Sequence, residues 1–503
     1  ACGTTLEHMV LRPSTMGVSR PLSAAAKPLP THVDVAIVGG GLGGLLLCAG
    51  LRCRGIDAHV FERAPALRNA SQGMFTASTN GIHASTHAGE EVKTIRVDRK
   101  GKGEVSIRWT KAQNIFASHV PDEVIHCSCG GRDFTEDDTG ATLVFEGRNE
   151  QVRAKMIVAV DGAFSALRPQ ILSRHREKRD GVKQVTKDGG QGSAAAALMI
   201  EDPPKYHGFL NWNALVKKED IARYAESAGV LLPYTERGMF IVTSDCPNVL
   251  AFIVDVGTHV FWQIRVPESS KAGHRAVAGR QGLKEHLLRG LRDATDLAVP
   301  IGQEAEKPQI PAGETQPNMS EIICMVGATP EEKIYERCIY GRAATSTITT
   351  PKGRVIMIGD AAHAPYPGPG QGANMTFEDV SVLIDMFEKH VPNIRAPNTA
   401  TVSNRDLTNG TTHKPDLNGH SNVELPAVVV PTILCECESI RLPRMQSMVY
   451  YADIAAWQFH TQASKIKDCR TKFNDWVKTF PPEGPPPSLE PFEPFVPRKV
   501  FRP

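Results

Sequence analysis

The first part of the chain alternates short apolar runs with glycines and charged residues. Residues 33–38 form an apolar run typical of a buried strand, residues 42–54 have the length of a helix, and residues 58–61 return to a strand pattern. A crossover connection between parallel strands is usually a helix. These patterns therefore predict a β–α–β unit at the start of a parallel sheet.

Two later strand patterns end beside a carboxylate and a glycine. Residues 155–160 lead into Asp161 and Gly162, and residues 354–358 lead into Gly359 and Asp360. The carboxyl ends of parallel strands share one sheet edge, where α/β sheets bind ligands. We therefore expect these side chains at a ligand-binding edge.

A long block between those two strands has strand patterns of its own, at residues 248–256 and 259–266. It begins at a polar linker, residues 178–193, which is typical of a domain junction. The block is therefore predicted to be an inserted domain built on a sheet.

The C-terminal third should be mainly helical. A helix is expected to run to about His390, a polar loop to occupy residues 392–422, and helical periodicity resumes near Leu434 and over residues 445–459. The last residues are rich in proline and should be extended.

Composition excludes several classes of protein. The 57 Lys and Arg nearly balance 55 Asp and Glu, so the net charge of +2 offers no field for nucleic acid. The hydrophobic fraction of 41% is that of a folded globular chain. Eleven cysteines, an odd number, suit reduced thiols better than a disulfide framework, and no metal site is predicted.

The longest apolar stretch, residues 35–51, contains six glycines and falls short of the ~20 apolar residues that cross a bilayer, so no transmembrane segment is predicted. Residues 1–31 carry Arg12, Arg20 and Lys27 against one acid, Glu7. Such a composition is typical of an organelle transit peptide, but a disordered, uncleaved tail has the same features, and the sequence opens with Ala1. The location stays open between the cytoplasm and an organelle.

Gly39, Gly41 and Gly44 form a GxGxxG motif between the first strand and helix. Such glycines allow a tight turn, admit a pyrophosphate and let helix and strand pack closely. Glu62 ends the next strand, at the position of a carboxylate that binds ribose. We interpret the motif as a dinucleotide-binding turn; the alternative is a glycine-rich turn with a surface glutamate.

Residues 359–379, GDAAHAPYPGPGQGANMTFED, are the most informative stretch. Asp360 can accept hydrogen bonds from a polyol, three prolines stiffen the loop, and Gly370 and Gly372 expose N–H groups as a helix begins. Such a loop suits a flat, electron-accepting ring. The segment DGAFSALR, residues 161–168, supplies a possible cap in Ser165 and a phosphate or carboxylate partner in Arg168, although it could be an ordinary turn.

In the order of these motifs, the chain resembles the single-component FAD-dependent aromatic hydroxylases, whose members include salicylate and 3-hydroxybenzoate hydroxylases and zeaxanthin epoxidase. The glycine turn with Glu62 is similar to the AMP-binding site, Asp161 and Gly162 to the second motif, and Asp360 to the residue that holds the ribityl chain. The resemblance covers roughly residues 32–390, with a weaker similarity at residues 438–444.

The fold that this resemblance implies is α/β: a Rossmann-like FAD-binding domain with a parallel sheet and helices, an inserted substrate domain on a mostly antiparallel sheet, and C-terminal helices. The predicted segments are a tail (1–31), the FAD-binding domain in two parts (32–175 and 336–391), the substrate domain (176–335), a polar insertion loop (392–430), C-terminal helices (431–480) and a proline-rich tail (481–503).

The resemblance also assigns cofactor contacts to the motif residues and their neighbours. These are Gly39, Gly41, Leu42, Gly43, Gly44, Glu62, Arg63, Arg108, Asp161, Gly162, Gly359, Asp360, Gly370, Gln371, Gly372, Ala373 and Asn374. Arg108 is matched to an arginine that precedes a cofactor-contacting helix in the family.

The activity implied is a monooxygenase reaction. NADH or NADPH reduces FAD, O₂ adds to give a C4a-hydroperoxyflavin, and this species hydroxylates or epoxidises a small aromatic or electron-rich apolar substrate. Pro367 would lie beside the flavin, near the substrate. The cavity must be dry, and Tyr206, His207, Trp212 and Asn213 are the candidates for its side on the inserted sheet.

His207 or Tyr206 could deprotonate a phenol, although an ordinary half-buried strand residue is the favoured interpretation of each. His363 is expected to make a structural hydrogen bond rather than to act as a base. Two other functions stay open: a flavin reductase, epoxidase or halogenase of the same fold, although no WxWxIP motif is present, and a flavin-binding scaffold that has lost catalysis. The oligomeric state is open.

Overall fold

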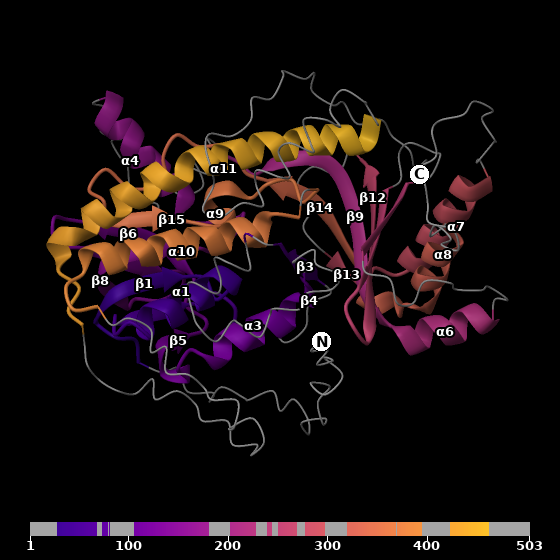
Figure 1. The fold of residues 1–503 in the computed structure, drawn as a ribbon, viewed down its shortest axis with the longest axis horizontal. Coiled ribbons are helices and arrows are strands. Elements are labelled where there is room, and N and C mark those ends of the chain that lie inside the picture. The colour runs from indigo at the N-terminus through magenta and orange to yellow at the C-terminus, as the bar shows by residue number, and fades with distance from the viewer. Residues whose placement is uncertain are drawn as a thin grey trace, which may run out of the picture.

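The computed structural model describes residues 28–67, 73–78, 80, 105–180, 202–227, 239–243, 250–268, 277–296, 319–368, 370–394 and 423–461. Within this part of the chain, two sheets stand side by side, and each has helices packed against it (Figure 1). Outside the described residues lie positions 1–27 of the predicted N-terminal tail, positions 462–480 of the predicted C-terminal helices, and the whole proline-rich tail 481–503. Most of the polar linker 178–193 and of the tract 392–422 lie outside them as well.

The larger sheet has seven strands in the order β5-β2-β1-β8-β7-β6, with β15 paired to β8 beyond this path. Its centre is parallel: β1 (His32–Val38) lies between β2 (Ala58–Phe61) and β8 (Gln151–Ala159), and β15 (Val355–Met357) is parallel to β8. Strands β5 (Ile125–His126), β6 (Gly131–Glu136) and β7 (Ala141–Phe145) complete it. The predicted β–α–β unit is therefore present.

Apolar helices cover this sheet because its central strands are buried on both faces. They are α1 (Leu42–Arg52), α3 (Trp109–Ser118), α10 (Gly372–His390) and α11 (Val430–Thr461). Sequence periodicity predicted two separate helical stretches near the C-terminus, whereas α11 is one helix with Pro443 inside it. The shorter pieces are α4 (Arg168–Asp180), α9 (Asp360–His363) and the small sheet of β3 (Met74–Ala77) and β4 (Val105–Arg108).

The second sheet has six strands in the order β10-β11-β12-β9-β14-β13, and every pair is antiparallel. Its strands are β9 (Lys205–Lys217), β10 (Met239–Thr243), β11 (Leu250–Asp255), β12 (His259–Pro267), β13 (Val277–Ala278) and β14 (Tyr335–Gly341). Helices α6 (Lys218–Ser227), α7 (Leu283–Asp296) and α8 (Met319–Ala328) cover its outer face. The fold class is that predicted from the sequence.

One strand of the second sheet crosses a predicted domain boundary. The inserted domain was expected to end at residue 335, but β14 continues to Gly341 and pairs with the central strand β9. The polar and charged residues of β14 hid its strand character, because alternate positions face the two sides of a sheet and only one of these sides is apolar.

The two sheets meet at a small apolar cluster of Phe209, Ile339, Tyr366 and Ala452. These residues come from β9, β14, the loop after α9 and α11, so α11 reaches from the first sheet to the second (Figure 1). Among the described residues, we find no helix that combines the length and apolarity needed to cross a membrane, and no cluster of side chains suited to hold a metal ion.

Candidate functional site

The glycine turn after β1 has the geometry that its motif requires. Gly39 has φ of +119°, which favours glycine. A Cβ on Gly44 would lie 2.0 Å from the Gly39 carbonyl oxygen, so this glycine allows α1 to pack directly on the strand end. A Cβ on Gly41 would meet no atom within 4 Å. The turn is therefore tight on one side and open on the side where α1 begins.

Leu42 and Gly43 begin α1, whose first N–H groups point out of the helix start. Glu62 lies beside this turn at the end of β2. Its Oε2 accepts a hydrogen bond from the Gly40 N–H at 2.6 Å, and its Oε1 accepts one from the Ala64 N–H at 2.8 Å. The helix dipole and free N–H groups favour an anion at this point.

Asp161 lies at the end of β8 beside the same turn, since a Cβ on Gly39 would come 3.0 Å from the Asp161 Cα. Its Oδ2 accepts a hydrogen bond from the Ala166 N–H at 2.9 Å, while its buried Oδ1 has no donor among the described residues. Burial raises the pKa of this carboxyl, and hydrogen bonds and the positive charge of Arg63 oppose that shift. An unmatched acceptor here fits a hydroxyl or amide donor of a bound cofactor.

Ser165 accepts hydrogen bonds from the N–H groups of Leu167 and Arg168, so it caps α4 as expected. The Arg168 side chain is not free for a phosphate. Its Nε donates to Asp202 at 2.6 Å and its Nη1 to the Ala362 carbonyl at 2.6 Å. It therefore ties α9 to the chain segment that enters the second sheet.

The third motif begins where β15 ends. Gly359 has φ of +58°, and Asp360 is exposed at the start of α9. A Cβ on Gly372 would lie 3.7 Å from Asp360 Oδ1, which places the carboxylate at the N-terminus of α10. Gly370 has φ of +69° and open space around its Cβ position. The Asp360 carboxylate, a hydrogen-bond acceptor, therefore lies close to the N–H groups at the start of α10.

The side chains of Gln371 and Asn374 are already engaged. Gln371 Nε2 donates to Ser78 Oγ at 3.2 Å, and Asn374 Oδ1 accepts from the Ser78 N–H at 3.0 Å. Ala373 is between them in the first turn of α10. These two side chains hold the segment after β3, so any cofactor contact at this turn would come from backbone groups.

His363 Nε2 lies 2.6 Å from Asp379 Oδ2, and the Gly359 N–H donates to the same oxygen at 2.9 Å. The structural hydrogen bond expected for His363 is therefore present. His363 and Arg441 hold the pKa of the Asp379 carboxyl below its usual value against the opposing effect of burial.

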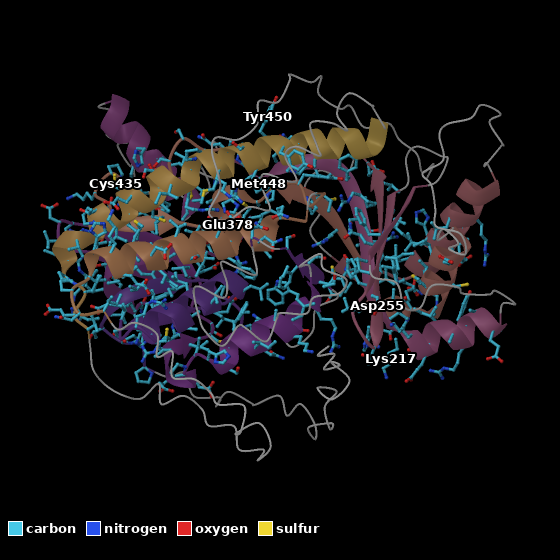
Figure 2. The ribbon with its side chains drawn as sticks, in the orientation of Figure 1. Lys217, Asp255, Glu378, Cys435, Met448 and Tyr450 are labelled. Carbon is cyan, nitrogen blue, oxygen red and sulfur yellow. The ribbon has the colours of Figure 1, made fainter. Side chains whose placement is uncertain are left out.

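A buried ion network between α10 and α11 supports this motif, and its central carboxylate, Glu378, is labelled in Figure 2. Glu378 Oε2 accepts from Arg441 at 2.7 Å and from Arg444 at 2.6 Å, and Glu378 Oε1 accepts from Asn80 Nδ2 at 2.7 Å. Sequence reasoning found only a family similarity at residues 438–444 and did not predict this network. The signal was available, because two arginines at i and i+3 lie on one face of a helix.

The second sheet presents two unlike faces. Trp212 lies in the apolar cluster under α7 and α8, with its Nε1 donating to Glu336 at 2.8 Å. The expectation that Trp212 lines a cavity beside the cofactor is therefore wrong, because alternate residues of a strand point to opposite faces. Asn211 and Asn213 point to the other face, which is the face toward the first sheet.

Tyr206 and His207 begin β9. The Tyr206 hydroxyl donates to the Glu268 carbonyl, and burial raises its pKa, so the phenol stays protonated at neutral pH. The role of Tyr206 as a base is disfavoured by this arrangement. His207 is buried against Tyr366, with ring centroids 5.4 Å apart, and its Nε2 has no partner among the described residues.

Desolvation lowers the pKa of His207 to about 4, although Asp453 opposes the shift. Its imidazole is therefore neutral at pH 7.

Arg108 ends β4 and directly precedes α3, as predicted. It lines a surface hollow with Lys111 and Asn114. Burial lowers the pKa of His259, and the positive charges of Arg108, Lys217 and Lys333 lower it further. A region of positive charge therefore lies where α3 approaches the second sheet.

Comparison with known proteins supports the interpretation of these motifs as an FAD-binding site. A family model of an FAD binding domain matches residues 299–391. The chain is similar to 3-amino-4-hydroxybenzoate 2-monooxygenase of Streptomyces cremeus, at 24% identity over 396 residues that cover 74% of this chain and 86% of that protein.

Two solved structures have a similar fold. HpxO of Klebsiella pneumoniae, complexed with FAD and uric acid, has a TM-score of 0.56 at 16% identity and covers 88% of this chain and 92% of its own. A salicylate hydroxylase substrate complex has a TM-score of 0.55 at 15% identity, with coverage of 89% and 94%. At these identities the structures establish the fold.

The fold, the glycine turn and the FAD-binding match together define an FAD-dependent oxidoreductase. Within that class, the chain is related to the FAD-dependent monooxygenases and has the fold of the aromatic hydroxylases. The family resemblance predicted from the motifs is confirmed.

Proposed function

We propose that the protein is an NAD(P)H-dependent monooxygenase that hydroxylates a small aromatic substrate. The observation that carries this proposal is the buried Asp161 Oδ1, which lacks a donor among the described residues and lies beside an open glycine turn. A dinucleotide with ribose hydroxyls would supply both the missing donor and the anion that the turn favours.

The residues present fit FAD. The start of α1 at Gly41, Leu42, Gly43 and Gly44 would bind the pyrophosphate, and Glu62 with Arg63 the adenosine side. Gly39 and Gly359 would permit the turns. Asp161 and Gly162 would contact the dinucleotide between these points, and Asp360 would accept hydrogen bonds from the ribityl chain. Backbone N–H groups at Gly370, Gln371, Gly372, Ala373 and Asn374 would meet the ring.

When bound, FAD would supply the redox chemistry that passes electrons from NADH or NADPH to O₂ and makes one oxygen atom available to the substrate. Overall, the substrate gains one oxygen atom, the other leaves as water, and the nicotinamide is oxidised. The protein must keep water away from the flavin during this reaction. The apolar contact of Phe209 and Tyr366 between the two sheets supports such exclusion.

Pro367 and His207 are the chain's candidates beside the reacting atoms. Pro367 follows Tyr366 in the loop that carries the third motif, and the Tyr366 ring packs against His207. A neutral imidazole can accept a proton from a phenol, although a pKa of about 4 makes His207 a weak base. We therefore assign it to orienting the substrate hydroxyl. Tyr206 stays in the proposal only as a neighbour of this position.

The relatives favour an aromatic substrate. One is named for a reaction on an aminohydroxybenzoate and one solved structure is a salicylate hydroxylase. For the nicotinamide, support comes from the positive region of Arg108, Lys111 and Lys333, because phosphates are drawn to such charge. Lys333→Glu should raise the KM for NADH or NADPH, and an unchanged KM would remove this region from the proposal.

The deciding experiment is reconstitution followed by a substrate screen. Purified chain is incubated with FAD, passed over a desalting column and examined for flavin absorbance. Aromatic acids and phenols are then tested for faster NAD(P)H oxidation, with H₂O₂ measured alongside. A hydroxylated product formed in proportion to NAD(P)H supports the monooxygenase. Reduction without product indicates a reductase, and a bound flavin that no nicotinamide reduces indicates a scaffold.

A further inference from the structure

Two cysteines lie two residues apart in the connection between β5 and β6. Cys127 is half-exposed and Cys129 is buried, and both side chains are thiols. Ser128 between them is exposed and has φ of +55°, a left-handed conformation that is uncommon for residues other than glycine. The chain bends at Cys127 and Ser128, so the two cysteines are closer together than they would be in an extended strand.

The Cys129 thiol is turned back toward Cys127. Its Sγ donates a hydrogen bond to the Cys127 carbonyl oxygen at 3.2 Å. That oxygen is about 2.4 Å from its own Cα by standard bond lengths, so the sulfur is within about 6 Å of the Cys127 Cα. Two extended residues span at most about 7 Å, a bend shortens this span, and disulfides usually join Cα atoms about 4.4–6.8 Å apart. A local adjustment of the turn therefore brings a disulfide within reach.

Arg148, which follows β7, supplies positive charge beside the buried thiol. Its Nη1 donates to Cys129 Sγ at 2.7 Å, while its Nη2 donates to the exposed Glu150 at 3.4 Å. Desolvation raises the pKa of the Cys129 thiol, and Arg148 opposes that shift. A guanidinium at this distance stabilises a thiolate as its proton leaves. Cys129 therefore suits the second step of an oxidation, and the more accessible Cys127 suits the first.

The cysteine turn is tied to the segment that follows β2. The Cys129 N–H donates to the Glu62 carbonyl oxygen at 2.8 Å, and the Ser128 N–H donates to the Ala64 carbonyl oxygen at 2.9 Å. Glu62 and Arg63 are the side chains proposed above for the adenosine side of FAD. A change in the backbone between the two cysteines is therefore passed directly to this side of the cofactor site.

We propose that Cys127 and Cys129 are a peroxide-reactive thiol pair whose disulfide weakens FAD binding. The oxidant is hydrogen peroxide. The Cys127 thiolate attacks one peroxide oxygen, the O–O bond breaks, and the hydroxide that leaves takes up the thiol proton to become water. Cys129 then attacks the sulfur of the resulting sulfenic acid, which forms the S–S bond and releases a second water. Two thiols are oxidised to one disulfide, and one peroxide is reduced to two waters.

The inference rests on the proposed function for the source of its oxidant. An FAD-dependent oxidoreductase that reduces O₂ without transferring an oxygen atom to a substrate produces hydrogen peroxide. Oxidised protein would lose its cofactor and stop producing peroxide, so the thiol pair would limit unproductive turnover. The thiol chemistry itself needs no turnover, because added hydrogen peroxide can reach the half-exposed Cys127.

The test measures the disulfide and the FAD affinity separately on the full chain. Cofactor-free protein is treated with hydrogen peroxide and digested without a reductant, and the peptide that contains both cysteines is weighed by mass spectrometry. Flavin fluorescence titration then gives the FAD dissociation constant of reduced and of oxidised protein. We expect the peptide to lose two hydrogen atoms and FAD binding to weaken about tenfold, and dithiothreitol to reverse both changes.

Four variants identify the sulfurs. Cys127→Ser should bind FAD like the reduced wild type and lose the response to peroxide, whereas Cys129→Ser should stop at a sulfenic acid that dimedone labels. Arg148→Gln should slow disulfide formation about tenfold, and an unchanged rate would overturn the role of the guanidinium. Cys435→Ser removes an exposed thiol of α11 and, as the matched control, should respond like the wild type.

The outcomes separate this inference from the proposed function. If no flavin binds to the reduced protein, the proposed function fails and the link to FAD fails with it, while the mass measurement still decides the disulfide. If flavin binds but peroxide gives no disulfide between Cys127 and Cys129, or Cys435→Ser abolishes the response, only the thiol pair is overturned. A disulfide that forms without changing the FAD dissociation constant overturns the link to the cofactor site.

Discussion

The two sheets of this protein offer different kinds of groups to the ligands proposed for them. The parallel sheet offers backbone: glycine turns, helix N-termini and strand ends at β1, β8 and β15. The antiparallel sheet offers side chains: Asn211, Arg265 and Arg337 come from three different strands and lie opposite one another in the strand register. The proposed cofactor contacts of the parallel sheet can therefore be recognised as sequence motifs, whereas the polar residues of the antiparallel sheet cannot.

The same contrast holds for what stabilises each sheet. The parallel sheet is held by an apolar core on both faces together with a buried ion network at Glu378. The antiparallel sheet has an apolar core on its helix side and unmatched polar atoms on the other. A protein can leave one face of a sheet with unmatched polar atoms where a ligand completes it.

The largest expected loss of stability comes from removing the buried carboxylate of Glu378, which lies beside the parallel sheet. Glu378→Ala leaves Arg441 and Arg444 buried with fewer partners, so the free energy of unfolding should fall by about 3–5 kcal/mol. Urea unfolding followed by circular dichroism measures this. Glu436→Ala removes an exposed partner of Lys389 and serves as the control, and its stability should differ little from that of the wild type. Equal losses in the two variants would contradict the structural role of the network.

The glycine turn should respond to overpacking. In Gly44→Ala the new methyl would lie 2.0 Å from the Gly39 carbonyl oxygen, which is backbone and cannot move aside, so we expect a loss of about 3 kcal/mol in the free energy of unfolding without cofactor. Thermal and urea unfolding of the cofactor-free protein provide the measurement. A variant as stable as the wild type would show that α1 can shift away from β1.

Acid should weaken the contact between the two sheets through His207. The pKa of His207 is lowered to about 4, so between that value and its ordinary value near 6.5 the unfolded chain binds a proton that the folded chain does not. Stability contributed by the neutral ring is therefore present above pH 6.5 and declines as the pH falls, by about 2 kcal/mol between pH 7.5 and 5. His207→Gln should lack this part of the decline. Parallel pH profiles of the two proteins would argue against a depressed pKa.

The smallest expected effect on stability is that of Gly41→Ala, a variant that tests cofactor binding separately from folding. A methyl at Gly41 meets no protein atom within 4 Å, so Gly41→Ala should unfold like the wild type when FAD is absent. It would project where the pyrophosphate is proposed to lie, and FAD affinity should fall about tenfold or more, which corresponds to ~1.4 kcal/mol. Flavin fluorescence titration measures this loss. If FAD affinity is unchanged, the phosphates do not approach this turn.

Much of the parallel half could be predicted from the sequence. The residues near β1, α1 and β2 are consecutive, and their glycines carry information because the backbone itself must turn or approach a ligand. The role of His363 was also predicted. The ion network of Glu378 was not, because its members lie on two helices separated by a long tract and only packing brings them together.

The antiparallel half shows what sequence alone leaves undecided. The strand patterns predicted a sheet, but not that β14 joins it or that Trp212 faces the helices while Asn211 and Asn213 face the first sheet. A strand shows the alternation of its residues without showing which face is buried, and shifting the register by one residue exchanges the two faces.

The amino-acid sequence by itself therefore determined the cofactor class, the order of the main elements and the positions of the glycines that are proposed to approach the cofactor. Only the tertiary structure decided which side chains of β9, β12 and β14 stand together, since Arg265 and Arg337 are distant in sequence and meet Asn211 through strand register alone. The conformation of a turn depends on consecutive residues, so the sequence predicts it. The face of a sheet combines residues from several strands, so it forms only when those strands pair.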